Sequence, residues 1–316
     1  MRVSRAITVW IMFAGLLLSC GDGEREGGDD RLLVMATTTI LGDVVENVVG
    51  DEARVQVLIP VGADPHDFQA SAAQIADLNR ADLVVSNGLG LEEGLENVLE
   101  AAAGDGVRVF AVGPELDPIP LLEGEEHGEE GEEHEEEGGL DPHVWLDPLR
   151  MADAARLIAA QLSEIDPATD WMTRAEDYAS QLEATDREIS DRLSSIPEEA
   201  RHLVTNHEAL GYFADRYGFE VVGVIIPGGS TLTDPSSAQL AELVEVMRRE
   251  RVTVIFAEAT EPSALAEAVA AELGDEVEVI ELFTEALGEP GSGADTLIGM
   301  LQTNARLITE ALGRAQ

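Results

Sequence analysis

Short apolar runs rich in β-branched residues alternate with helical segments, and this alternation most strongly constrains the fold. In the first part of the chain the expected strands cover residues 32–38, 54–60, 82–86 and 107–112, and the expected helices cover residues 40–49, 72–80 and 91–103. The strand segments contain few polar residues, which is typical of parallel strands covered on both faces. We therefore expect a parallel β-sheet with helices on both sides.

The second part of the chain repeats this alternation. Expected strands cover residues 202–206, 219–225, 252–257 and 277–283, and helices cover 207–217, 236–249, 262–273 and 295–313. The predicted fold class is α/β, with two β/α lobes that each contain a roughly four-stranded parallel sheet.

The stretch between the lobes has no strand signal. It contains an amphipathic helix over residues 149–165 and a longer one over 170–193. In the longer helix, apolar residues recur at helical spacing and are expected near one face, namely Met172, Ala175, Tyr178, Leu182 and Ile189. We expect a long rigid helix to join the lobes. The predicted N-terminal lobe covers residues 31–165, the connecting helix 166–198 and the C-terminal lobe 199–316.

The first nineteen residues have the pattern of an export signal. Arg2 and Arg5 precede a short apolar run, which ends at Ser19 and Cys20 in a sequence that resembles a lipobox. We expect residues 1–19 to be a lipoprotein signal peptide, Cys20 to carry a membrane-anchoring lipid, and the acidic residues 20–30 to be a flexible tether. An ordinary signal peptide or an uncleaved anchor is the alternative.

Composition excludes some functions. The formal net charge of −44 argues against a nucleic-acid partner, because the phosphates would be repelled, and it is compatible with the attraction of cations. The single cysteine excludes an intramolecular disulfide framework and a thiolate zinc cluster.

Two of the six histidines lie in the same tripeptide, Asp-Pro-His. His66 follows the second expected strand and His143 lies in LDPHVWLDP. Proline stiffens the backbone before each imidazole, and Asp64 and Asp141 are candidates to hold the second ring nitrogen. A structural role would be the simpler interpretation of either tripeptide alone, but the repetition favours a pair of metal ligands.

The C-terminal lobe offers two further ligands. His207 and Glu285 follow expected strands, and the carboxyl ends of parallel strands are where such sheets place ligands. Glu258 is an alternative ligand, or a carboxylate that supports one. His202 is interpreted as structural, and Asp234 and Asp295 as residues that begin helices.

Together, His66, His143, His207 and Glu285 predict a metal site in the cleft between the lobes. Three imidazoles and one carboxylate match the tetrahedral coordination of Zn(II). Residues 123–139 form a glutamate-rich run that contains His127 and His134. This run is either a solvated loop or an auxiliary low-affinity trap for metal ions.

These residues resemble the metal-binding receptors of bacterial ABC importers, which form solute-binding protein family 9, also described as adhesin lipoproteins. The resemblance covers residues 31–314 and rests on the lipobox, ADPHDFQAS, DPHVWLDP, TNHEALGYFADRYG and ELFTEALG. It implies two β/α lobes, a rigid connecting helix, one metal ion between the lobes, and delivery to a membrane permease that is powered by an ATPase.

Within that family, zinc receptors resemble a three-histidine pattern, often with a His- and acid-rich loop, whereas manganese receptors resemble a pattern of two histidines and two carboxylates. His207 stands where the manganese type would have Glu, so the resemblance implies Zn(II), with Mn(II) as the alternative. At position 285 many members have Asp instead of Glu, and some zinc receptors use water.

The expected protein is thus a monomeric, lipid-anchored receptor on the outer side of the cell membrane, and not an enzyme. A manganese or iron receptor and a surface adhesin clipped by metal remain alternatives. A zinc hydrolase is disfavoured because the sequence has four candidate ligands and no His-Glu-x-x-His motif.

Overall fold

The computed structural model describes residues 31–121, 139–274 and 277–314. The expected signal peptide (1–19), Cys20 and the expected tether (20–30) lie outside the described residues, as do His127 and His134. The described residues from Leu32 onward belong to one compact unit.

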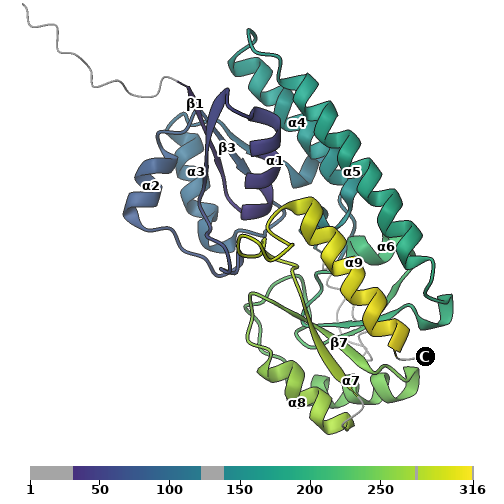
Figure 1. Cartoon of the computed structure of the whole chain (residues 1–316). Helices are drawn as coiled ribbons and strands as arrows, with labels where there is room; N and C mark the ends of the chain where they lie inside the picture. Colours follow the sequence, from purple (N-terminus) through teal and green to yellow (C-terminus); the bar gives the residue numbers. More distant parts are fainter. Residues whose placement is uncertain (1–30, 122–138, 275–276, 315–316) are drawn as a thin grey trace, which may run out of the picture. The chain divides into compact units, whose positions relative to one another are not determined.

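The N-terminal lobe contains four parallel strands, β1 (Leu32–Ala36), β2 (Ala53–Val57), β3 (Leu83–Ser86) and β4 (Val109–Ala111), in the order β2-β1-β3-β4. Successive residues of a strand point to opposite faces. Val34 belongs to the apolar cluster of helix α1 (Thr39–Val49), whereas Met35 belongs to that of α2 (Ala72–Leu78) and α3 (Glu96–Gly104). Helices therefore cover both faces of this sheet (Figure 1).

The C-terminal lobe has the same architecture. Its strands are β5 (His202–Thr205), β6 (Glu220–Val224), β7 (Val254–Glu258) and β8 (Glu278–Leu282), in the order β6-β5-β7-β8 and all parallel. Val204 and Ile255 pack in the cluster of α7 (Ser237–Glu250) and α8 (Ala264–Leu273). Leu203 and Phe256 lie in the cluster that includes α6 (Gly211–Tyr217) and α9 (Leu297–Arg314). The predicted α/β class with two four-stranded parallel sheets is confirmed.

Two long helices connect the lobes, α4 (Pro148–Ile165) and α5 (Trp171–Leu193). Helix α5 packs along α4 and contacts both α1 and α9 (Figure 1). It therefore contacts one helix of the N-terminal lobe and one helix of the C-terminal lobe. The prediction that Met172 lies on the buried face of α5 is wrong, since its exposed fraction is 38%. Trp171 is buried instead and donates its indole N–H to the Asp166 carbonyl at 3.0 Å.

Three helices begin at other residues than predicted. Helix α7 has Ser236 as its N-cap, not Asp234, because Ser236 and Gln239 form a reciprocal capping box. Asp295 does not cap α9, because its carboxylate accepts a hydrogen bond from the Gly291 N–H at 2.8 Å, while the Thr296 hydroxyl accepts from Gly299 at 3.1 Å. Helix α6 begins at Gly211. His207, four residues earlier, lies in a bend after β5.

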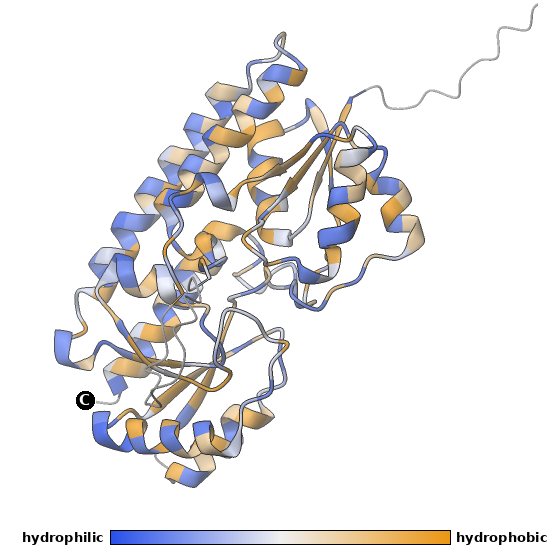
Figure 2. Ribbon diagram, turned by 180° about the vertical axis from the view of Figure 1, so that it is seen from behind, coloured by the Kyte–Doolittle hydropathy of each residue, from blue (hydrophilic) through white to orange (hydrophobic). Residues whose placement is uncertain are grey.

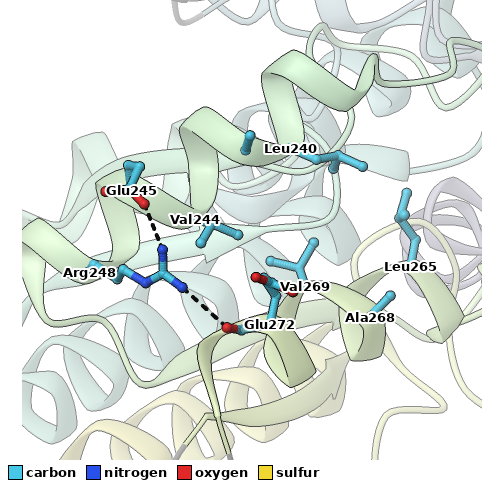
Figure 3. Close-up of a pocket in the computed structure, with 9 residues that line it drawn as sticks. Leu240, Val244, Glu245, Arg248, Leu265, Ala268, Val269 and Glu272 are labelled. Atoms are coloured by element: carbon cyan, nitrogen blue, oxygen red, sulfur yellow. Dashed lines mark hydrogen bonds and ion pairs between the residues drawn. The ribbon is translucent and has the colours of Figure 1, made fainter.

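Apolar residues concentrate on the strands and on the inner faces of the helices (Figure 2). A groove of about 380 Å³ lies between α7 and α8. On its rim Arg248 donates to the Glu245 carboxylate at 2.6 Å and to the Glu272 carbonyl at 3.3 Å (Figure 3). Within the three described segments, no helix is both long and apolar enough to cross a membrane.

Candidate metal centre

Four predicted site residues come together between the two lobes. His66 lies in the loop between β2 and α2, and His143 directly precedes the 3-10 turn Val144–Leu146, which leads into α4. His207 follows β5 and Glu285 follows β8. Because parallel strands end at the same edge of a sheet, each lobe presents its ligand-bearing loops at one edge.

The ligand atoms of these residues gather around one point, since all lie within 4.8 Å of one another. The Nε2 atoms of His143 and His207 are 3.0 Å apart. One Glu285 oxygen lies 3.5 Å from Nε2 of His143 and 3.7 Å from Nε2 of His207, and the other lies 3.8 Å from Nε2 of His66. All four residues are buried.

Carboxylates form hydrogen bonds to two of the three imidazoles, at the ring nitrogen that faces away from the centre. The Asp141 carboxylate lies 2.7 Å from Nδ1 of His143 and also accepts from the backbone N–H of His143 at 2.9 Å. Glu258, the last residue of β7, makes the equivalent hydrogen bond to Nδ1 of His207. These pairs set the orientation of both rings and leave Nε2 of each ring directed at the centre.

His66 is held differently. Asp64, predicted to support its ring, accepts instead from the backbone N–H of His66 at 2.9 Å and from the hydroxyl of Thr231. In the described segments the carboxylate nearest to Nδ1 of His66 is Glu93, at 3.9 Å, which is beyond hydrogen-bonding distance. The His66 loop is therefore fixed through its backbone, whereas its ring has no hydrogen bond to any residue that the structure describes.

Both nitrogens of His66 and both oxygens of Glu285 are buried without a hydrogen-bond partner among the described residues. Buried polar groups nearly always have partners, and leaving one unsatisfied costs about 1–3 kcal/mol. A divalent cation at the centre would accept the lone pair of His66 Nε2 together with lone pairs of the Glu285 oxygens. The donor set thus fits a metal ion.

The pKa values indicate which of these groups hold a proton when no cation is bound. Burial, together with the neighbouring imidazoles, lowers the pKa of His66 to about 3, and burial also lowers the pKa of His143. Burial lowers the pKa of His207 too, but Glu258 and the other carboxylates outweigh this effect and bring it to about 9. Burial raises the pKa of Glu285 well above its usual value. A bound cation would displace the protons that His207 and Glu285 hold.

Trp145 joins the two halves of the site. Its indole N–H donates to the carbonyl of Thr284, one residue before Glu285, at 2.6 Å. Its ring packs edge-on against the His143 ring, with 5.3 Å between the ring centroids. One side chain thus contacts His143 and the segment that carries Glu285. In the sequence, Trp145 stands out only as part of the motif DPHVWLDP.

Gly211 and Tyr212, at the start of α6, fix Asp141. A β-carbon on Gly211 would lie 2.3 Å from Oδ2 of Asp141, so no larger residue fits there without movement. The Tyr212 hydroxyl donates to the Asp141 carbonyl at 2.8 Å. The sequence signal for both is the GY pair that follows NHEAL, although nothing local connects it with residue 141.

A second buried carboxylate supports the other side of the Asp-Pro-His segment. The side-chain amide of Asn87 donates to the Pro142 carbonyl at 2.9 Å. Glu92 accepts from the backbone N–H of Asn87 at 2.7 Å and from the Thr37 hydroxyl at 2.6 Å. The glycine-rich stretch NGLG after β3 is the signal that could have identified this turn.

His202 lies apart from the centre. It is partly exposed and its Nε2 is 3.8 Å from the Glu220 carboxylate, at the beginning of β5. The groove between α7 and α8 is likewise lined by none of the four central residues.

Two parallel β/α lobes that bury a set of imidazoles and carboxylates between them define a two-lobed solute-binding receptor for a small cation. The sequence pattern of the ZnuA family, described as "Zinc-uptake complex component A periplasmic", matches residues 34–311, and the chain belongs to this family. The resemblance inferred from the motifs is thereby confirmed.

Individual relatives agree with this assignment over nearly the whole chain. The manganese-binding lipoprotein MntA of Bacillus subtilis is 33% identical over 313 residues, which cover 96% of this chain and 97% of the relative. The manganese ABC transporter substrate-binding lipoprotein PsaA of Streptococcus mitis is 28% identical over 320 residues, which cover 97% of this chain and 98% of the relative. The solved structure of the periplasmic zinc-binding protein TroA of Treponema pallidum matches with a TM-score of 0.78 and 32% identity, over 89% of this chain and 99% of that one.

Proposed function

We propose that this receptor binds one Zn(II) ion through His66, His143, His207 and Glu285 and delivers it to an ABC importer. The single observation that carries the proposal is the buried group of imidazole and carboxylate atoms that have no partner other than one another. The role is binding and release rather than catalysis, because all four groups face the same point and are available to one ion.

The donor set favours zinc. Three imidazole nitrogens and one carboxylate oxygen are the borderline ligands that zinc prefers, at the coordination number that zinc adopts in closed sites. The ion and Glu285 would together leave about one positive charge at the centre. The carboxylates of Asp141 and Glu258, which hold two of the rings, lie where they stabilise that charge.

Manganese is the second candidate. Two of the relatives are named for manganese, and a Glu carboxylate offers two oxygens, the ligand type that manganese prefers. Three imidazoles against one carboxylate nevertheless favour zinc over manganese.

The test is a comparison of metal content and affinity between the native chain and His207→Ala. The native protein, purified without added metal, should contain zinc at one ion per chain. His207→Ala should weaken zinc binding in a competition assay by more than about 100-fold, which exceeds the effect typical of residues that only orient a ligand. His202→Ala is the matched control and should bind as the native chain does. Unchanged affinity in His207→Ala, or manganese as the bound metal, would contradict the proposal.

Membrane attachment and delivery complete the proposed function. Relatives named as lipoproteins and as an ABC transporter component support lipid attachment at Cys20 and docking to a permease with its ATPase. We propose that the receptor acts as a monomer on the outer side of the membrane. Cys20→Ser should release the protein from the membrane fraction; a variant that stays membrane-bound would contradict attachment at that residue.

A further inference from the structure

One side of the centre opens toward a cavity. Behind His143 and His207 stand Asp141 and Glu258, whose hydrogen bonds hold both rings. The ring of His66 has no such partner, and among the four ligands only His66 lines a cavity of about 420 Å³ found in the described part of the chain. The residues around this cavity are His66, Asp67, Gln69, Glu93, Gly94 and Leu232.

The wall of the cavity is built against the His66 loop. Glu93 and Gly94 belong to the 3-10 turn Glu93–Leu95, and a β-carbon on Gly94 would lie only 2.3 Å from the carbonyl oxygen of Phe68. This close approach holds the Glu93 carboxylate 3.9 Å from Nδ1 of His66.

Two carboxylates line this cavity between the buried His66 ring and the solvent. The Glu93 side chain is 42% exposed, whereas that of His66 is fully buried. Asp67, the neighbour of His66 in sequence, is also exposed and lines the same cavity. A cation that approaches from this side would meet two exposed carboxylates and then an imidazole without a partner.

We propose that the metal ion enters and leaves through this cavity, which we call the mouth of the site. Asp67 and Glu93 bind the ion first, and His66 binds it next. The inference rests on the proposed function. Acidic groups at the rim of a cleft raise the local cation concentration and the association rate. Their oxygens also replace water molecules one at a time while the ion loses its hydration shell. The two carboxylates therefore govern the rate of exchange, whereas the four buried residues determine affinity.

The test is stopped-flow mixing of Zn(II) with metal-free full-length protein, followed by tryptophan fluorescence, because the Trp145 ring packs on His143. The variant is Asp67→Asn combined with Glu93→Gln. The control is Glu96→Gln combined with Glu100→Gln, which removes the same charge from exposed residues of α3 outside the cavity. The dissociation rate is measured by adding an excess of chelator.

In the mouth variant the association rate constant should fall about tenfold at low ionic strength, and added salt should shrink the difference, because the charges are exposed. The dissociation rate constant should fall by a similar factor, since the same path serves exit and the four buried residues determine affinity. The control should keep the native rates. An unchanged association rate, an equal loss in the control, or a rise in the dissociation rate alone would overturn the inference. Native protein that binds no zinc at equilibrium would instead overturn the proposed function, and the entry path with it.

Discussion

At the scale of single residues, the three imidazoles differ in what lies behind them. Asp141 and Glu258 hold the rings of His143 and His207, and each contact has a carboxylate oxygen on Nδ1. Such partners raise the basicity of the ligand nitrogen and keep it directed at the ion. His66 lacks this support.

Removing either carboxylate should therefore weaken metal binding without removing a ligand. We expect Asp141→Asn and Glu258→Gln each to reduce zinc affinity by about 10–100-fold in a chelator competition assay. Glu281→Gln, an exposed residue of the neighbouring strand β8, is the control and should bind like the native chain. Native affinity in both carboxylate variants would mean that these contacts do not orient the rings.

Gly211 provides a steric test of the same support. In Gly211→Ala the new methyl group would displace the Asp141 carboxylate, which lies 2.3 Å from its position, and zinc affinity should fall by about tenfold or more. Gly313→Ala is the matched control. Gly313 lies in α9, and apart from its own helix backbone and its two chain neighbours no described atom lies within 4 Å of the added carbon. Equal affinities in the two variants would show that Asp141 tolerates displacement.

At the scale of secondary-structure elements, Asp43 ties three helices together. Its carboxylate, on α1, accepts from the Tyr178 hydroxyl of α5 at 2.6 Å and from the backbone N–H of Leu297 at the start of α9 at 3.3 Å. Burial raises the pKa of Asp43, although both hydrogen bonds lower it in part. The folded state therefore holds a proton on Asp43 more tightly than the unfolded state does.

This linkage predicts a pH dependence of stability. A carboxyl group with a raised pKa in the folded state contributes fully to stability at low pH, and the contribution is lost as pH rises through that pKa. Asparagine keeps an oxygen for both donors but does not titrate. From about pH 3 to pH 7, the free energy of unfolding of the native chain should thus fall relative to that of Asp43→Asn, as measured by urea denaturation. The exposed Asp105→Asn serves as control, and parallel curves for all three proteins would refute the linkage.

The order of elements could be predicted from the sequence because each buried strand is a short apolar run and each helix has a period of 3.6 residues. The exact residues at which helices start could not be predicted. Ser236 and Asp234 are both good N-cap residues, and only the capping box that Ser236 forms with Gln239 decides between them. Trp171 and Met172 are neighbours on α5 and point in different directions, and the apolar pattern does not show which of them faces the core. In the structure Trp171 is buried and makes a hydrogen bond, whereas Met172 is exposed.

At the scale of the whole molecule, the candidate site could be located because its four residues lie in repeated motifs or at strand ends. Its supports could not be predicted, because they join distant segments. Trp145 bonds to a carbonyl 139 residues away, and Tyr212 to one 71 residues away. Local sequence patterns carry no signal for such contacts.

The two lobes also share one apolar cluster, which includes Val34 and Leu83 of the first sheet and Leu203 and Phe256 of the second. Both sheets therefore meet the connecting helices through a continuous core. Because the candidate metal centre lies between the lobes, a bound ion would have two ligands from each half of the chain.

The measurement that tests this central claim most directly is a crystal structure of the zinc-loaded protein with anomalous data on both sides of the zinc absorption edge. We expect one strong peak, with imidazole nitrogens of His66, His143 and His207 at about 2.0–2.1 Å and an oxygen of Glu285 at about 2.0–2.2 Å. A peak elsewhere in the molecule, or a peak with ligands from only one lobe, would contradict the proposed zinc site.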